Sequence, residues 1–155
     1  MRLLPTYLRR LPLRAPCLAC CAKGGANGCD EKREGKARMI HIVGAGSGAA
    51  DLITLRGARL LRAADVVVWA GSLVNPELLA ECKESCVVYD SAHMTLEEVL
   101  DVMCAADARG EEVVRLHTGD PCLYGAIQEQ MDALDARGVD YEVVPGVSSF
   151  CGAAA

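Results

Sequence analysis

Aromatic residues and long apolar runs are both scarce in this sequence of 155 residues. One Trp, one Phe and four Tyr make up 4% of it, although 52% of the residues are hydrophobic. A core of ordinary size is therefore packed through small aliphatic side chains, which is typical of α/β proteins. No apolar run approaches the length of a membrane span, so we expect no membrane partner.

Basic residues are few after position 38. The first 38 residues carry nine basic and three acidic side chains (+6), and residues 39–155 carry seven basic and eighteen acidic (−11), which together give the net −5. A general nucleic-acid binder needs a basic face for the phosphates. The acidic body argues against that class of protein.

The sequence has nine cysteines but no visible disulfide framework, because the number is odd and the spacing is irregular. It also lacks the uninterrupted apolar segment of a signal peptide. We therefore expect reduced thiols in a cytoplasmic protein. Cys17, Cys20, Cys21 and Cys29 have no second C-x-x-C and no nearby His, so no metal site is predicted. Residues 1–38 are predicted to be a disordered basic leader or the product of a misassigned start.

From position 39 onward, apolar runs alternate with segments of helical periodicity. The runs predict strands at residues 39–43, 65–70, 86–89, 112–117 and 139–144. The periodic segments predict helices at residues 54–64, 76–82, 95–109 and 125–137. This order predicts an α/β domain with a mostly parallel five-stranded sheet and helices on both faces. The chain stops without a linker, so we expect residues 39–155 to be an N-terminal domain cut short, with its C-terminal domain missing.

A glycine-rich loop follows the first predicted strand at residues 44–51, GAGSGAAD. Glycines there let a ligand approach the backbone. The spacing also fits the G-x-G-x-x-A fingerprint of dinucleotide sites, which need an acidic residue at the end of the second strand. That place holds Trp69, Ala70 and Gly71. A ligand loop and a simple tight turn remain equally open on this motif alone.

Two more loops follow predicted strands, at residues 117–125 (HTGDPCLYG) and 144–149 (VPGVSS). Asp120 is expected either to cap the next helix or to lie near a cationic ligand such as a sulfonium. Ser148 and Ser149 are expected to be helix N-caps or ligand contacts. If the strands are parallel, all three loops lie along one edge of the sheet and share a crevice.

The pattern VGAGxGxxDLITxRGxxxLxxADVV at residues 43–67, followed by TGDP and VPGVSS, resembles the tetrapyrrole methylase family. Residues 70–79, 90–98 and 123–130 resemble its precorrin-4 or cobalt-precorrin-4 C11-methyltransferase branch. The resemblance runs from residue 39 to 155. It implies a cytoplasmic methyltransferase of cobalamin biosynthesis that uses S-adenosyl-L-methionine (AdoMet), acts on a tetrapyrrole and forms a homodimer in its full-length form.

The resemblance also implies which residues form the site. The expected AdoMet contacts are Ser47, Thr118, Gly119, Asp120, Leu123, Ser148 and Ser149, and Ser47 stands where the family usually has Pro. The expected substrate contacts are Ser72, Asp90, His93 and Met94. No catalytic side chain is expected, because the sulfonium donor is already activated and the protein mainly aligns the reactants.

The substrate carries many carboxylates, so cationic groups are needed in an acidic body. Arg56, Lys83, His93 and Arg115 are the candidates, although each is more typical of a solvated surface charge or a charge at a helix end. Three alternatives stay open. They are a methylase of another tetrapyrrole carbon, a nicotinamide-binding module, and an inactive truncated fragment. The chain alone is expected to be inactive, since the family completes the AdoMet site with a second domain.

Overall fold

A computed structural model of the protein describes residues 39–155. It contains one sheet of five parallel strands in the order β3-β2-β4-β1-β5. The strands are β1 (Ile40–Gly44), β2 (Val66–Trp69), β3 (Val87–Asp90), β4 (Val113–His117) and β5 (Tyr141–Val144). The parallel α/β sheet predicted from the sequence is therefore confirmed. The expectations for residues 1–38, namely a leader, a misassigned start and the absence of a zinc site, lie outside the described residues.

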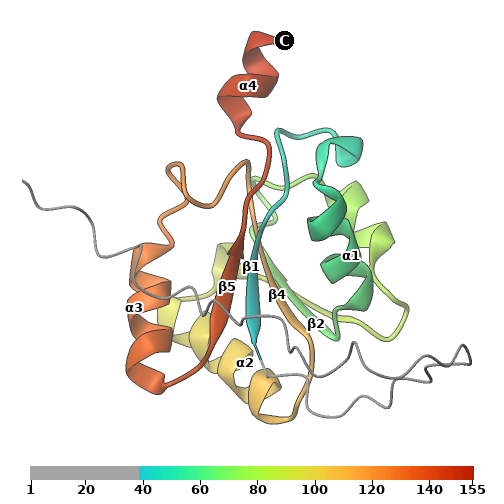
Figure 1. Cartoon of the computed structure of the whole chain (residues 1–155). Coiled ribbons are helices and arrows are strands. Elements are labelled where there is room, and N and C mark those ends of the chain that lie inside the picture. The colour runs from blue at the N-terminus through green and yellow to red at the C-terminus, as the bar shows by residue number, and fades with distance from the viewer. Residues whose placement is uncertain (1–38) are drawn as a thin grey trace, which may run out of the picture. The chain divides into compact units, whose positions relative to one another are not determined.

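Helices cover both faces of the sheet (Figure 1). One face is covered by α1 (Leu55–Ala63) and the 3-10 helix η4 (Pro76–Glu81), and the other by α2 (Leu96–Ala108) and α3 (Gln128–Arg137). Short elements at the strand ends are η3 (Ala50–Leu52), η5 (Ser91–His93) and α4 (Ser149–Ala154). Within residues 39–155, no helix has the length and apolar character needed to cross a bilayer.

The core has two layers because successive strand residues point to opposite faces. On β4, Val114 and Leu116 belong to the α1 layer and Val113 belongs to the α2 layer, and all three are fully buried. A strand in the middle of a parallel sheet is covered on both sides, which explains its apolar sequence. β3 forms an edge of the sheet, and there Val87 and Val88 are exposed.

Helix α2 begins with the capping box that its sequence predicts. The Glu98 backbone N–H donates to Thr95 Oγ1 at 3.3 Å, and the Thr95 N–H donates to Glu98 Oε2 at 2.7 Å. Val99, Leu100 and Met103 are buried as expected, whereas Leu96 is partly exposed in the first turn.

Loss of this cap has a measurable cost. Thr95→Ala is expected to lower the free energy of unfolding by about 1 kcal/mol, because the Glu98 N–H loses its acceptor. Urea denaturation measures the change. Thr95→Ser keeps the hydroxyl and is the matched control, so an equal loss in both variants would contradict this role for the cap.

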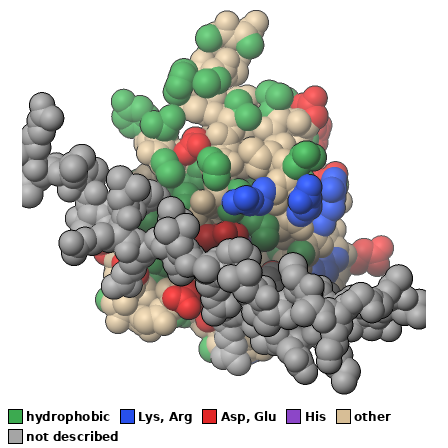
Figure 2. Space-filling model, viewed as in Figure 1, with side chains coloured by type: hydrophobic (Ala, Val, Ile, Leu, Met, Phe, Trp, Pro, Cys, Tyr) green, Lys and Arg blue, Asp and Glu red, His purple; other side chains and the backbone are tan. Residues whose placement is uncertain are grey.

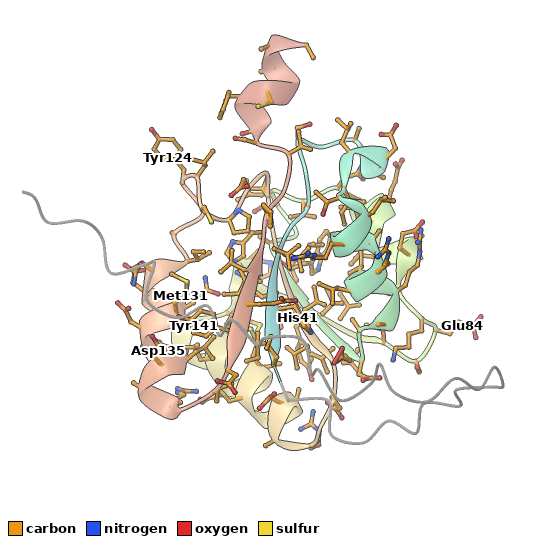
Figure 3. All side chains as sticks on the ribbon, viewed as in Figure 1. His41, Glu84, Tyr124, Met131, Asp135 and Tyr141 are labelled. Carbon is orange, nitrogen blue, oxygen red and sulfur yellow. The ribbon has the colours of Figure 1, made fainter. Side chains whose placement is uncertain are left out.

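Helix α3 begins later than its periodicity suggests. The expected start was position 125, whereas the helix begins at Gln128. Tyr124 and Ala126 have positive φ angles of 59° and 48°, which a right-handed helix does not accept. The chain between β4 and α3 is therefore an extended loop, and the fully exposed Tyr124 lies at its tip (Figure 3).

Candidate ligand site at the carboxyl edge of the sheet

The three glycine-bearing loops follow β1, β4 and β5, which are neighbours in the sheet. Residues 44–49, 118–123 and 145–149 are together called the rim below. The first two loops join in a short antiparallel bridge. Gly119 N–H donates to the Gly46 carbonyl at 2.9 Å, and Gly46 N–H donates to the Gly119 carbonyl at 3.3 Å. Both glycines have positive φ, +86° at Gly46 and +60° at Gly119, so a side chain would be strained at either position.

Asp120 ties the second loop to the third. Its Oδ2 accepts a hydrogen bond from the Gly146 N–H at 3.2 Å, and its Oδ1 accepts one from the Cys122 N–H at 2.8 Å. The expectation that Asp120 caps the following helix is wrong, because the N-cap position of α3 is Ile127. The carboxylate instead fixes the spacing between two loops that are distant in sequence.

The three loops pack so closely that only glycine fits at two places. A Cβ atom at Gly44 would lie 2.6 Å from both the Gly119 carbonyl oxygen and the Gly146 Cα. A Cβ atom at Gly146 would collide with the same carbonyl oxygen and with the Gly44 backbone. The rim is therefore one packed unit and not three independent turns.

Most of the expected AdoMet contacts lie around this unit. A Cβ at Gly119 would be in ordinary contact with Ser148 and Ser149, and the Ser47 side chain lies against Gly152 of α4. Within residues 39–155, the hydroxyl groups of Ser47, Thr118, Ser148 and Ser149 form no hydrogen bond with protein atoms. Ser148 is the N-cap of α4, but its side chain does not bond to the helix. The hydroxyl groups remain available to a ligand.

The rim lies where the chain changes direction across the sheet. After β1 the chain passes to α1 on one face, and after β4 it passes to α3 on the other. The carboxyl ends of adjacent strands with opposite crossovers form the usual ligand crevice of open α/β sheets. Gly46 and Gly119 meet at this point.

The expected substrate contacts lie at the neighbouring ends of β2 and β3. Ser72, Asp90 and His93 are exposed, whereas Met94 is half-buried against the α2 layer. Asp90 Oδ1 accepts hydrogen bonds from the Ala92 and Gly71 N–H groups, both at 2.9 Å, and these bonds hold the pKa of the carboxyl below its usual value. The structure thus brings these residues to the same edge of the sheet as the rim.

A buried polar cluster lies below this edge on the α3 face. Arg115 and His117 of β4 are 7% and 8% exposed, and Gln130 in the first turn of α3 is 6% exposed. Arg115 Nε donates to Gln130 Oε1 at 3.3 Å, and its Nη1 donates to Ser91 Oγ at 3.0 Å and to the Val68 carbonyl at 3.2 Å. His117 and Gln130 were not predicted from the sequence. The available signal was an Arg and a His two positions apart in an apolar strand.

Burial keeps His117 uncharged at neutral pH. Desolvation is the main cause, with the nearby charge of Arg115, and together they lower the pKa of His117 from 6.5 to about 4. Desolvation likewise lowers the pKa of Arg115 to about 10, which still leaves the guanidinium charged.

The lowered pKa of His117 makes the stability of the folded chain depend on pH. Between pH 6.5 and about 4 the unfolded chain binds a proton at His117 that the folded chain does not, so the free energy of unfolding falls as pH drops. The difference between the pKa values of His117 in the unfolded and folded chain corresponds to about 3 kcal/mol in the free energy of unfolding. This stability is fully present above pH 6.5 and is lost as the pH falls to about 4. The measurement compares wild type with His117→Gln in urea at pH 7 and pH 4.5. A difference between the two proteins that does not change with pH would contradict a neutral buried imidazole, and His93→Gln controls for loss of an exposed one.

The sequence profile of the Tetrapyrrole (Corrin/Porphyrin) Methylases matches residues 39–155. The chain belongs to the tetrapyrrole methylase family. A curated methylase named cobalt-precorrin-4 C(11)-methyltransferase, from Methanocaldococcus jannaschii, is 52% identical over 118 residues, which are 76% of this chain and 46% of the relative. The chain therefore spans about half the length of the curated methylases it matches.

Solved methylase structures agree with the fold. A cobalt precorrin-4 methyltransferase superposes with a TM-score of 0.73 at 50% identity, over 76% of this chain and 49% of that one. A uroporphyrin-III C-methyltransferase from Thermus thermophilus, solved in complex with S-adenosylhomocysteine, gives a TM-score of 0.63 at 35% identity, over 75% and 48%. The described residues of this chain contain no group of three or more His, Cys, Asp or Glu side chains placed to hold a metal ion.

Proposed function

We propose that this domain binds AdoMet at the rim and serves methyl transfer to carbon C11 of precorrin-4 or cobalt-precorrin-4 in cobalamin biosynthesis. The observation that carries the proposal is the joining of three loops by the Gly46–Gly119 bridge and the Asp120–Gly146 hydrogen bond. The 52% identity to a C11-methyltransferase supports this branch over a methylase of another tetrapyrrole carbon.

The residues of the rim fit AdoMet by their chemistry. The ribose hydroxyls and the amino-acid end of AdoMet need hydrogen-bond partners, and Thr118, Ser148 and Ser149 have hydroxyl groups that no atom of the described chain engages. Among the rim glycines, Gly48 is exposed and Gly146 is half-buried, which favours near approach of a ligand to the backbone there. We propose Ser47, Thr118, Gly119, Asp120, Leu123, Ser148 and Ser149 as the contacts.

When bound, AdoMet supplies a methyl group from a positively charged sulfonium, so the protein needs no nucleophile of its own. The chain contributes alignment, because the Gly46–Gly119 bridge and the hydrogen bond from Gly146 to Asp120 hold the three loops at fixed spacing. The apolar side chains of Leu123, Tyr124 and Phe150 are exposed near the rim, on the end of the molecule where Figure 2 shows hydrophobic groups on α4 and the loops beside it. They offer surface that a bound ligand shields from water.

A nicotinamide module is the competing class. Its usual acid at the end of the second strand is lacking, because Trp69 and Ala70 stand there and Asp65 lies at the opposite end, 2.6 Å from Lys83 Nζ. Asp90 reaches this edge from β3, but Gly71 and Ala92 already donate to its carboxylate.

We further propose a cytoplasmic protein that forms a homodimer at full length, with Ser72, Asp90, His93 and Met94 near the tetrapyrrole.

Calorimetric titration with AdoMet and, separately, with NAD tests the class of ligand. We expect saturable heat with AdoMet at weak affinity, because this chain spans 46% of its relative's length, and none with NAD. Heat with NAD alone, or with neither ligand, would contradict AdoMet binding by this chain. Mass spectrometry of the tetrapyrrole after incubation with AdoMet then tests methyl transfer; with this chain alone we expect none, and a mass gain of one methyl group would contradict the expectation that it is inactive by itself.

A further inference from the structure

Arg115 is a buried cation that has no acidic partner. No carboxylate within residues 39–155 forms an ion pair with it, and burial is the sole cause of its lowered pKa. Buried charges in proteins are normally paired, because desolvation of an unpaired ion is costly. By contrast, Arg62, Lys83, Arg109 and Arg137 all lie on the surface and all have carboxylate partners.

The guanidinium is also only partly used as a hydrogen-bond donor. Nε and Nη1 donate to Gln130, Ser91 and the Val68 carbonyl, which leaves both hydrogens of Nη2 without an acceptor in the described part of the chain. The bonds at Nε and Nη1 fix the plane of the guanidinium, so the N–H groups of Nη2 point in a fixed direction and can donate to one oxygen of a carboxylate.

His117 supplies a second, independent observation. It follows Arg115 on the same face of β4, and its Nε2 is fully buried with no hydrogen-bond partner among residues 39–155. Buried polar atoms almost always have a partner, so an orphaned one at a polar cluster points to a group from outside the chain. Gln130 adjoins both side chains and holds them in one cluster.

The position of the cluster indicates where such a group comes from. Ser91, which accepts from Arg115, begins η5 directly after Asp90 and donates to the Trp69 carbonyl at 2.9 Å. The cluster therefore lies under the ends of β2 and β3, beside the proposed tetrapyrrole contacts. It is on the α3 face of β4, and its His117 directly precedes Thr118 of the rim.

We propose that Nη2 of Arg115 and Nε2 of His117 form a carboxylate-binding subsite, which receives an acidic side chain of the tetrapyrrole and sets its orientation. This inference rests on the proposed function for the source of the carboxylate. Of the four cationic candidates in the sequence, Arg115 is the one held in place by the fold: Arg56 and His93 are exposed, and Lys83 pairs with Asp65.

Nitrogen-15 NMR of the Arg115 side chain and the His117 ring, during titration with propionate, tests the subsite on the chain as it is. Propionamide has the same shape without the charge and is the control ligand. We expect saturable shifts at both residues with propionate, none with propionamide, and a rise in the pKa of His117, because a bound anion favours the imidazolium. Shifts of equal size with both ligands, or none with either, would overturn the proposal.

Two variants separate binding from a purely structural role. Arg115→Lys keeps a charge but loses the fork, and we expect propionate affinity to fall about tenfold. Ser91→Ala removes a hydrogen bond of Nη1 and leaves Nη2 intact, so its affinity should stay within about twofold of wild type. An equal loss in both variants, or retained affinity in Arg115→Lys, would contradict the assignment. His117→Gln, expected to weaken binding, decides the matter if Arg115→Lys does not fold.

A titration with S-adenosylhomocysteine distinguishes the two sources of a carboxylate. We expect it to shift the rim amides and leave the Arg115 side chain unchanged. Shifts at Arg115 and His117 with this ligand would assign the subsite to the amino-acid end of the cofactor and overturn the tetrapyrrole source. Rim shifts without any propionate response would leave the proposed function standing and refute the subsite alone.

Discussion

Gly146→Ala is expected to lower AdoMet affinity at least about tenfold and the free energy of unfolding by about 1–3 kcal/mol. The added methyl group would collide with the Gly119 carbonyl oxygen and the Gly44 backbone. No flexible side chain can move aside there, so the third loop must shift away from the first two. Such a shift lengthens the Asp120–Gly146 hydrogen bond and opens the rim.

Urea denaturation and AdoMet titration measure the two effects. Gly110→Ala is the matched control, because Gly110 follows α2 at the opposite edge of the sheet, with open space around its Cβ and a φ of +81°. It costs backbone strain of about 1 kcal/mol without contact to the rim. If Gly146→Ala binds AdoMet as well as Gly110→Ala does, the close packing of the loops has no bearing on the ligand.

Asp120→Ala is the second change with a large expected effect. Two backbone N–H groups, of Gly146 and Cys122, lose their shared carboxylate acceptor. Hydrogen bonds to a charged group contribute more than neutral ones, and we expect a loss of about 2 kcal/mol in the free energy of unfolding. AdoMet binding is expected to fall by more than about tenfold, because the second and third loops are no longer joined.

Asp120→Asn and Asp51→Ala complete this test. The asparagine keeps one acceptor oxygen, so its loss of stability should be smaller than that of alanine. Asp51 is exposed in η3 and controls for removal of a negative charge near the first loop. Equal AdoMet affinity in Asp120→Ala and Asp51→Ala would show that the hydrogen bonds accepted by Asp120 do not shape the ligand site.

Much of the fold could be predicted from local patterns. The five apolar runs became five parallel strands, each bounded by Gly, Pro or a helix cap, although the run at the edge of the sheet, β3, is exposed. The start of α2 followed from Thr95 and Glu98 alone. The start of α3 could not be predicted, because Tyr124 and Ala126 adopt positive φ in a loop whose shape depends on contacts with the Pro121 backbone at Gly125.

Part of the candidate site could likewise be predicted from the sequence, and part of it could not. The three loops were identified from glycine and serine patterns, and the parallel order of the strands puts them on one edge. The role of Asp120 required the strand order, since its partner Gly146 is 26 positions away on a loop from a strand not adjacent to β4. The cluster of Arg115, His117 and Gln130 depends on the packing of α3 over β4, which periodicity alone does not define.

Amide chemical-shift mapping with S-adenosylhomocysteine most directly tests whether the three loops form one ligand site. We expect the amides of Gly46, Gly119 and Ser148 to shift together along one saturation curve, while amides of α2 and the amino ends of the strands stay unchanged. Shifts confined to one loop, or centred on residues away from the carboxyl ends of β1, β4 and β5, would contradict the account.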